Sequence, residues 1–129
     1  MLAIDTNLVI RYLVGDHPTQ AAKARSLIDG NDVFVGATVL LESEWVLGSI
    51  YGFDSERITA ALAAFAGLPR VTVEDPALLA TALDWMSKGI DFADALHLLR
   101  PEHCEAFVTF DARFAKAANR LGGLSVRTP

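Results

Sequence analysis

The sequence predicts an α/β fold in which a central, mostly parallel sheet of four to five short strands is covered by helices on both faces. Apolar runs of three to five residues, which suit buried strands, alternate with longer stretches whose apolar residues recur at helical spacing. Strands separated by helices pair in parallel, because each helix carries the chain back across the sheet. The expected strands are residues 2–4, 33–35, 71–73, 106–110 and 124–126.

Seven helices are expected around these strands, at residues 8–14, 18–30, 39–51, 55–66, 76–88, 92–99 and 112–121. Prolines begin the second and fifth helices, and glycines follow most of the helix ends. The expected capping residues are Thr6 or Asn7, Thr38, Asp54 or Ser55, Asp91 and Asp111. The third helix is apolar almost all the way round, so we expect it to be largely buried.

The composition predicts one soluble globular domain, spanning residues 1–129, with 52% hydrophobic and 21% charged residues. The single cysteine, Cys104, cannot form an internal disulfide, which favours a reducing cytoplasm. No apolar stretch reaches bilayer length, and Asp5 interrupts the apolar start as a signal peptide would not, so no membrane partner is expected. The net charge of −5 argues against a simple cationic platform for nucleic acid.

Four carboxylates stand at positions that purely structural demands tend to avoid. Asp5 follows the first expected strand and Asp111 the fourth, so the two acids approach at one sheet edge if those strands are neighbours. Glu42 lies within a mostly apolar helix, and Asp94 lies in the first turn of another. Helical spacing does not separate Glu42 from Glu44, and a solvated helix face would explain either one.

Each of the other acids also has a structural explanation. Asp5 and Asp111 are good helix caps, and Asp94 is a candidate reciprocal partner of Asp91 in a capping box. The coincidence of all four is stronger than any one of them alone.

If the four acids converge, they need a positive partner. Unit charges ~4 Å apart repel by about 4 kcal/mol at an effective dielectric of ~20. A divalent cation removes this repulsion, and ligation by oxygen alone suits Mg²⁺ or Mn²⁺ rather than Zn²⁺. Such an ion can activate water and neutralise charge on a phosphodiester, which indicates hydrolysis of a phosphate ester.

Four blocks of sequence resemble those of one known family: IDTN at 4–7, VLLESEWVL at 39–47, GIDFADALH at 89–97 and VTFDARF at 108–114. In this order and spacing they are similar to the PIN-domain ribonucleases, and within these to the VapC-type toxins of type II toxin–antitoxin systems. The resemblance covers the whole chain. It implies a three-layer α/β/α PIN-like fold and an endoribonuclease that depends on Mg²⁺ or Mn²⁺.

The resemblance also implies a metal site and partners. Asp5, Glu42, Asp94 and Asp111 fall on the acidic quartet of the family, which selects Glu42 over Glu44. The implied partners are an RNA substrate, a cognate VapB-type antitoxin that covers the active groove, and a second copy of the chain in a homodimer or a larger toxin–antitoxin assembly.

Further residues take supporting roles by resemblance. Thr6 and Asn7 are similar to the polar pair beside the first acid, and Thr109 to the hydroxyl that orients the last. Asp91 either caps its helix or contacts the metal or a water, and Arg113 either contacts a phosphate or lies on a solvated face.

Three more residues are ambiguous from the sequence. His97 supports the nearby acid, contacts substrate, or packs. Arg11 meets nucleic acid or complements the helix dipole, and Trp45 belongs to the core or to a self-association surface.

Two other functions compete with this interpretation. Phosphatases of the haloacid-dehalogenase type also place an aspartate after the first strand, but they need a second one where this chain has Asn7. A catalytically silent PIN-like module would bind RNA or protein without cutting, although such modules commonly lack the acids that this chain retains.

Overall fold

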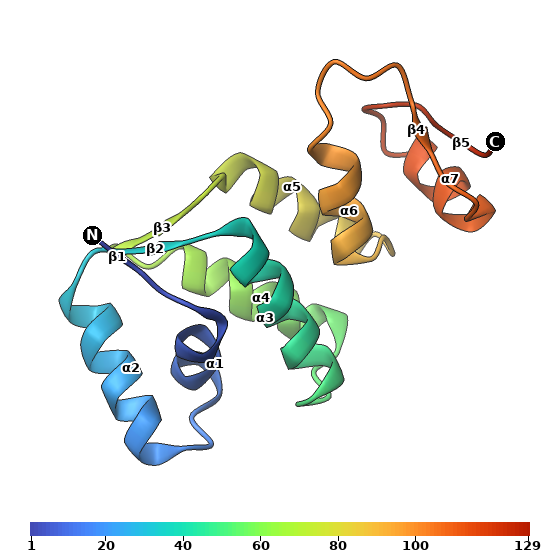
Figure 1. Cartoon of the computed structure of the whole chain (residues 1–129). Coiled ribbons are helices and arrows are strands. Elements are labelled where there is room, and N and C mark those ends of the chain that lie inside the picture. The colour runs from blue at the N-terminus through green and yellow to red at the C-terminus, as the bar shows by residue number, and fades with distance from the viewer. The chain divides into compact units, whose positions relative to one another are not determined.

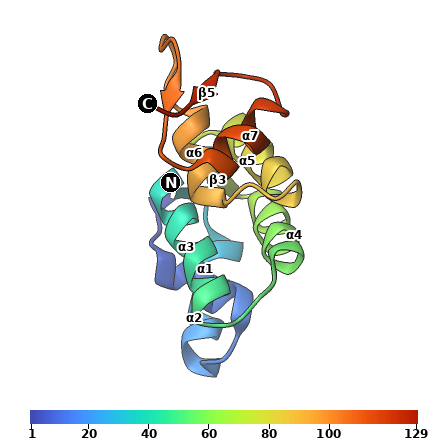
Figure 2. The same cartoon turned by 90° about the vertical axis from the view of Figure 1, so that its right-hand side faces the viewer.

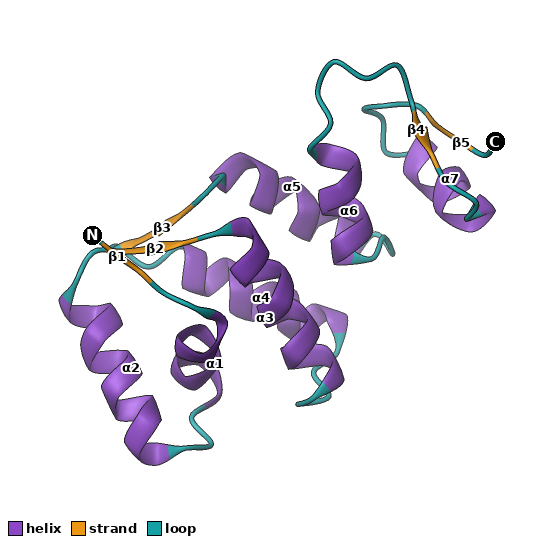
Figure 3. Cartoon of the chain, in the orientation of Figure 1, coloured by secondary structure: helices purple, strands orange, loops and turns teal.

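Five short strands and seven helices alternate along the chain, which the structure, a computed structural model, describes from Met1 to Pro129 (Figures 1 and 3). The chain divides into an N-terminal unit, Met1–Pro76, and a C-terminal unit, Ala77–Pro129. Helices and parallel strands alternate as the sequence predicts, so the α/β class is confirmed, although the sheets are small.

The N-terminal unit contains a three-stranded parallel sheet in the order β1-β2-β3. The strands are β1 (Leu2–Ala3), β2 (Val33–Val35) and β3 (Val71–Val73), and the last two have the predicted bounds. Val33 and Val35 of the central strand are fully buried, as short apolar runs in parallel sheets usually are.

Four helices pack around this sheet: α1 (Thr6–Val14), α2 (Pro18–Gly30), α3 (Ala37–Ser49) and α4 (Ser55–Ala66). Helix α1 packs against both α2 and α3, and α3 packs against α4 (Figures 1 and 2). Their largest fully buried apolar side chains are Val9, Ile10, Ile28, Leu47, Leu62 and Phe65. The α1–α2 pair therefore follows directly from β1, at the end of the strand where the first candidate acid lies.

Two of the predicted helix starts are wrong by a few residues. Asp5 caps α1, as its structural explanation predicted, whereas Thr6 and Asn7, the other expected caps, already lie inside the helix. Helix α3 starts directly after Gly36 without a side-chain cap, so Thr38 is inside it rather than in front of it. In both places the helix begins closer to the preceding strand than the position of the good capping residues suggested.

The prediction that the third helix is largely buried is wrong for one side of it. Leu40, Ser43 and Leu47 are buried at intervals of three and four residues, which defines a single inner stripe. Trp45 is 58% exposed and Ile50, just after the helix, is 65% exposed. Trp45 therefore does not belong to the core.

The C-terminal unit combines three helices with a two-stranded parallel ladder. The helices are α5 (Pro76–Ser87), α6 (Phe92–Leu99) and α7 (Ala112–Asn119), and the strands are β4 (Phe107–Val108) and β5 (Val126–Arg127). The side-chain amide of Asn119 donates to the carbonyl oxygen of Val126 at 2.7 Å and accepts from its N–H at 2.9 Å. These two hydrogen bonds hold β5 against the C-terminal end of α7.

Two predictions drawn from the composition concern membrane-spanning segments and the single cysteine. None of the helices combines the length and the apolar character needed to cross a bilayer. Cys104 is a free thiol on an exposed loop position.

Candidate functional site

Asp5 lies at the junction of β1 and α1. Its Oδ1 atom accepts a hydrogen bond from the Leu8 N–H at 3.2 Å, which satisfies one of the free amides of the first helical turn. The other carboxylate oxygen has no protein partner, and the residue is exposed. The structural and the ligating interpretations of Asp5 are thus compatible, since capping uses only one of its two oxygens.

Glu42 lies in α3 on the side opposite the buried stripe. Its neighbour Ser43 is fully buried and its hydroxyl donates to the Val39 carbonyl oxygen at 2.7 Å, whereas Glu42 is exposed and forms no hydrogen bond or ion pair. Both of its carboxylate oxygens are therefore available.

The C-terminal unit carries the other two acids, each near a helix start. Asp91 caps α6 as predicted, because its Oδ2 atom accepts from the Asp94 N–H at 3.2 Å. The reciprocal bond, from the Asp91 N–H to the carboxylate of Asp94, is absent, so the capping box does not form. Asp111 caps α7 through a 3.0 Å bond from the Phe114 N–H to its Oδ1 atom.

Asp94 is the acid that its surroundings disfavour most. It is partly buried, and its carboxylate has no hydrogen-bond partner. Burial raises the pKa of Asp94 above its ordinary value, the negative charges of Asp91 and Asp111 raise it further, and only His97 opposes them. The charges of Asp91 and Asp111 thus both act on Asp94 and disfavour its ionised form.

The donors fit a hard divalent cation by type. Each of the four candidate acids keeps at least one carboxylate oxygen free of protein hydrogen bonds, and all-oxygen ligation suits Mg²⁺ or Mn²⁺. Within neither unit do three or more His, Cys, Asp or Glu side chains gather closely enough to hold an ion by themselves. The choice of Asp5, Glu42, Asp94 and Asp111 as ligands therefore stays a prediction.

The predicted supporting residues differ in what they contact. The Thr109 hydroxyl accepts from the Asp111 N–H at 3.1 Å, so it holds the backbone of that acid rather than its carboxylate. Thr6 is buried but forms no bond to Asp5, and Asn7 is exposed without a partner. Arg113 is exposed and unpaired, which leaves its guanidinium available to a phosphate.

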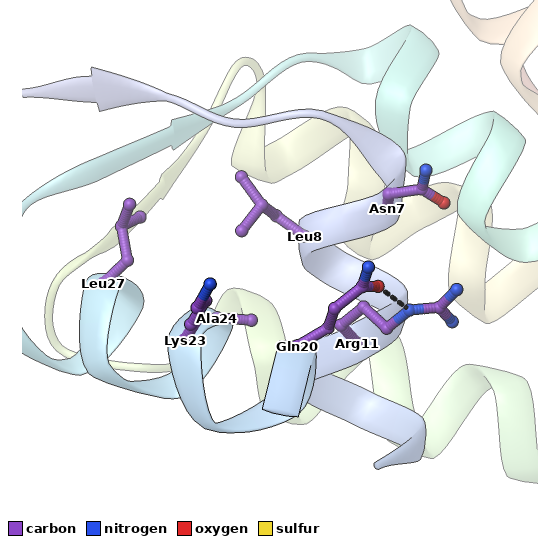
Figure 4. Close-up of a pocket in the computed structure, with 7 residues that line it drawn as sticks. All are labelled: Asn7, Leu8, Arg11, Gln20, Lys23, Ala24 and Leu27. Atoms are coloured by element: carbon purple, nitrogen blue, oxygen red, sulfur yellow. Dashed lines mark hydrogen bonds between the residues drawn. The ribbon is translucent and has the colours of Figure 1, made fainter. Parts of the chain in front are cut away.

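A cavity that the sequence analysis did not single out lies between α1 and α2, beside Asn7 (Figure 4). Its α2 wall consists of Gln20, Lys23, Ala24 and Leu27. Their separations of three, four and seven residues are those of a single helix face, a signal that the sequence does contain.

Comparison with known protein families gives a match over most of the chain. The sequence profile of the PIN domain family matches residues 2–120, nearly the whole chain. PIN domains are typically metal-dependent nucleases that act on RNA. A search of curated proteins finds no matching relative.

Proposed function

The chain belongs to the PIN domain family, and from this premise we propose that it is an endoribonuclease dependent on Mg²⁺ or Mn²⁺. We further propose that it acts as the toxin of a VapBC-type toxin–antitoxin pair, held inactive by a VapB-type antitoxin. The four sequence blocks that resemble VapC-type toxins support this finer assignment.

The observation that carries the proposal is the environment of Asp94. A partly buried carboxylate without a hydrogen bond, beside two other aspartates, is unfavourable in a protein with only structural requirements. A bound cation would relieve both the burial of the charge and the repulsion. Perturbed acids of this kind are characteristic of functional sites.

Asp5, Glu42, Asp94 and Asp111 are the residues that would hold the ion. When bound, a divalent cation neutralises charge on the scissile phosphate and makes water a better nucleophile. The protein holds two of the acids in place by its own bonds, since Asp5 and Asp111 are each fixed to the first turn of a helix.

The remaining residues position these acids or the substrate. Thr109 fixes the backbone of Asp111, and Asp91 fixes the turn that carries Asp94. Thr6 and Asn7 flank Asp5 at the start of α1. Arg113, exposed in the first turn of α7, supplies a cation for a substrate phosphate.

RNA is the proposed substrate, in single-stranded or loop form, because of the family resemblance. Since the net charge of the chain is −5, a bound cation rather than a basic surface would draw the phosphate to the acids. The cytoplasm is the proposed location, and a homodimer the proposed assembly of the free toxin.

The test is cleavage of structured RNAs by the purified chain, freed of antitoxin, in Mg²⁺ or Mn²⁺ and in EDTA. Asp5→Asn is the decisive variant, because asparagine caps a helix as well as aspartate does but is a much weaker ligand. Asp54→Asn is its matched control, since Asp54 caps α4 through the same kind of bond, at 2.8 Å.

We expect EDTA and Asp5→Asn to abolish cleavage and Asp54→Asn to preserve it. Cleavage that persists in EDTA, or equal activity of the two variants, would refute the metal-dependent mechanism. RNA binding without cleavage under every condition would favour the catalytically silent alternative.

A further inference from the structure

The cavity between α1 and α2 has a volume of about 320 Å³ and an apolar interior. Leu8 of α1 and Leu27 of α2 direct their side chains into the space between the helices, with Ala24 beside them (Figure 4). This volume is at the small end of the range for ligand pockets. The cavity is therefore large enough for a single ring system and too small for a helix.

Cations and amides line the rest of the cavity, and no carboxylate does. In a chain with a net charge of −5, a pocket wall that carries Arg11 and Lys23 is a local reversal of the overall charge. Such a local excess of positive charge favours an anionic group on whatever binds there.

Arg11 is held rigidly in this wall. Its Nε donates to Gln20 at 2.7 Å, and one terminal nitrogen donates to the Tyr51 hydroxyl at 3.2 Å and contacts Asp16 at 3.4 Å. Its other terminal nitrogen has no partner, and its side chain is only 19% exposed. Asp16 offsets part of its charge, so the unpaired cation of the cavity is Lys23.

Lys23 is exposed and has no ion pair or hydrogen bond. Asn7 likewise has no partner, and Gln20 uses only its carbonyl oxygen, which leaves its NH₂ group free to donate. The cavity thus offers an apolar slot, unpaired amides and a free cation. A nucleotide could contact these three features with the face of its base, the edge of its base and its phosphate, respectively.

The position of the cavity relative to Asp5 indicates where such a ligand would come from. Asn7 is two residues beyond Asp5, and Arg11 lies about 9 Å farther along α1 than that acid, at about 1.5 Å per residue. A strand whose phosphate meets Asp5 carries its neighbouring nucleotide into this range.

We infer that the α1–α2 cavity binds one nucleotide of the RNA strand next to the scissile phosphate, with its base between Leu8 and Leu27 and its phosphate at Lys23. This inference rests on the proposed nuclease function for the identity of the strand. An acidic peptide with an apolar side chain would also match the cations, so its binding is one outcome of the test.

The test measures binding separately from cleavage. In EDTA, where no cleavage occurs, the four nucleoside monophosphates and a short single-stranded oligoribonucleotide are titrated into the chain. Amide shifts in the NMR spectrum locate the site, and fluorescence anisotropy at several salt concentrations gives the affinity. We expect shifts at Leu8, Lys23 and Leu27, and a preference among the four bases.

Lys23→Gln is the principal variant, and Lys88→Gln is its control of equal charge. We expect Lys23→Gln to weaken oligonucleotide binding roughly two- to fivefold, as for other exposed charge contacts. The dependence of log affinity on log salt should become shallower by about 0.7, the value for one phosphate contact on a single strand. Lys88→Gln removes a positive charge that is paired with Asp84 at 3.0 Å, and should change neither quantity.

Leu27→Trp fills the space between the two helices and should weaken binding severalfold, because the base then has no room beside Leu8. If Leu27→Trp does not fold, Lys23→Gln still tests the inference, because Lys23 lies on the surface and its substitution should not disturb folding. Wild-type affinity, salt dependence and base preference in Lys23→Gln would overturn the inference. Binding of an acidic leucine-containing peptide at these residues, without nucleotide binding, would overturn it as well.

The two proposals fail separately. Nucleotide binding in the cavity of a chain that never cleaves RNA would refute the nuclease and leave the cavity inference standing. Metal-dependent cleavage with no nucleotide bound between α1 and α2 would refute the cavity inference and leave the nuclease proposal standing.

Discussion

The candidate acids of the two units are in different environments. In the N-terminal unit, Asp5 and Glu42 are exposed, and a helix cap already accounts for the position of Asp5. In the C-terminal unit, Asp94 is partly buried without a hydrogen bond, and the charges of Asp91 and Asp111 act on it. The stronger sign of function therefore comes from the unit where the protein tolerates an unfavourable charge.

Helix caps teach the complementary lesson. Asp5, Asp54 and Asp111 each accept a backbone N–H three residues on, at 3.2, 2.8 and 3.0 Å. Asp54 belongs to no candidate site, so the capping bond alone does not distinguish a ligand from a structural residue. Substitutions that keep the cap and remove the charge can distinguish them.

We expect the largest effect from Asp94→Asn, on the rate of RNA cleavage. We expect RNA cleavage to fall by at least about a hundredfold, since loss of groups that support a metal site commonly costs 10- to 100-fold and loss of a ligand costs more. Asp84→Asn, an exposed change on α5, is the control and should retain activity. Full activity of Asp94→Asn in a steady-state assay would show that the unfavourable environment of Asp94 does not mark it as a functional residue.

The next effect is stabilisation by metal. A cation that binds only the folded chain stabilises it by about 2.7 kcal/mol at a concentration of 100 times Kd. We expect Mg²⁺ or Mn²⁺ to raise the midpoint of thermal unfolding of the wild type, and Asp94→Asn to lose most of that rise. Calorimetry on both proteins measures this, and equal shifts in the two would exclude Asp94 as a ligand.

A smaller effect separates capping from ligation at Asp111. Asp111→Ala removes the bond to Phe114 and should lower the free energy of unfolding by about 1 kcal/mol, whereas Asp111→Asn keeps the cap and should change it little. Glu42→Gln removes no contact, so we expect it to change the free energy of unfolding by less than about 0.5 kcal/mol. Urea titration in EDTA gives these values. A loss in Glu42→Gln as large as that in Asp111→Ala would show a structural role for Glu42.

The smallest effect is the pH dependence caused by Asp94. Its folded-state pKa is raised above the ordinary 3.8, so between that value and the folded pKa the folded chain binds more protons than the unfolded chain. Stability contributed by this group is therefore present below pH 3.8 and is lost as the pH rises through the folded pKa.

Asp94→Asn removes this loss. In metal-free buffer we expect the variant to be more stable than the wild type at neutral pH, by roughly 0.5 kcal/mol or less, and the difference to vanish in acid. Denaturation midpoints measured at several pH values test this, and a variant that is less stable at neutral pH would indicate that Asp94 has a structural partner.

Much of the fold follows from local sequence signals. The bounds of β2, β3 and α6 agree with prediction, because apolar runs, a capping aspartate and a following proline mark them unambiguously. The starts of α1 and α3 were missed for the opposite reason. Thr6, Asn7 and Thr38 are all good caps, and the choice depends on where the strand before each helix ends.

The residue types of the candidate site are a prediction from the sequence, whereas their contacts come from the structure. From its spacing, Asp94 could have been the capping partner of Asp91. Only the structure shows that its carboxylate accepts no hydrogen bond. The exposure of Trp45 was also unpredictable, since an apolar helix does not reveal which of its sides meets the rest of the chain. The cavity between α1 and α2 depends on how two helices meet, which neither helix encodes alone.

The amide of Asn119 has a consequence for solubility. Two bonds to β4 use the carbonyl oxygens of Ser125 and Arg127, and Asn119 occupies both backbone groups of the residue between them, Val126. The outer edge of β5 therefore has no free pairing groups at its centre, where a strand from another molecule would otherwise add. A single side chain thus protects the C-terminal strand against aggregation by edge-to-edge pairing.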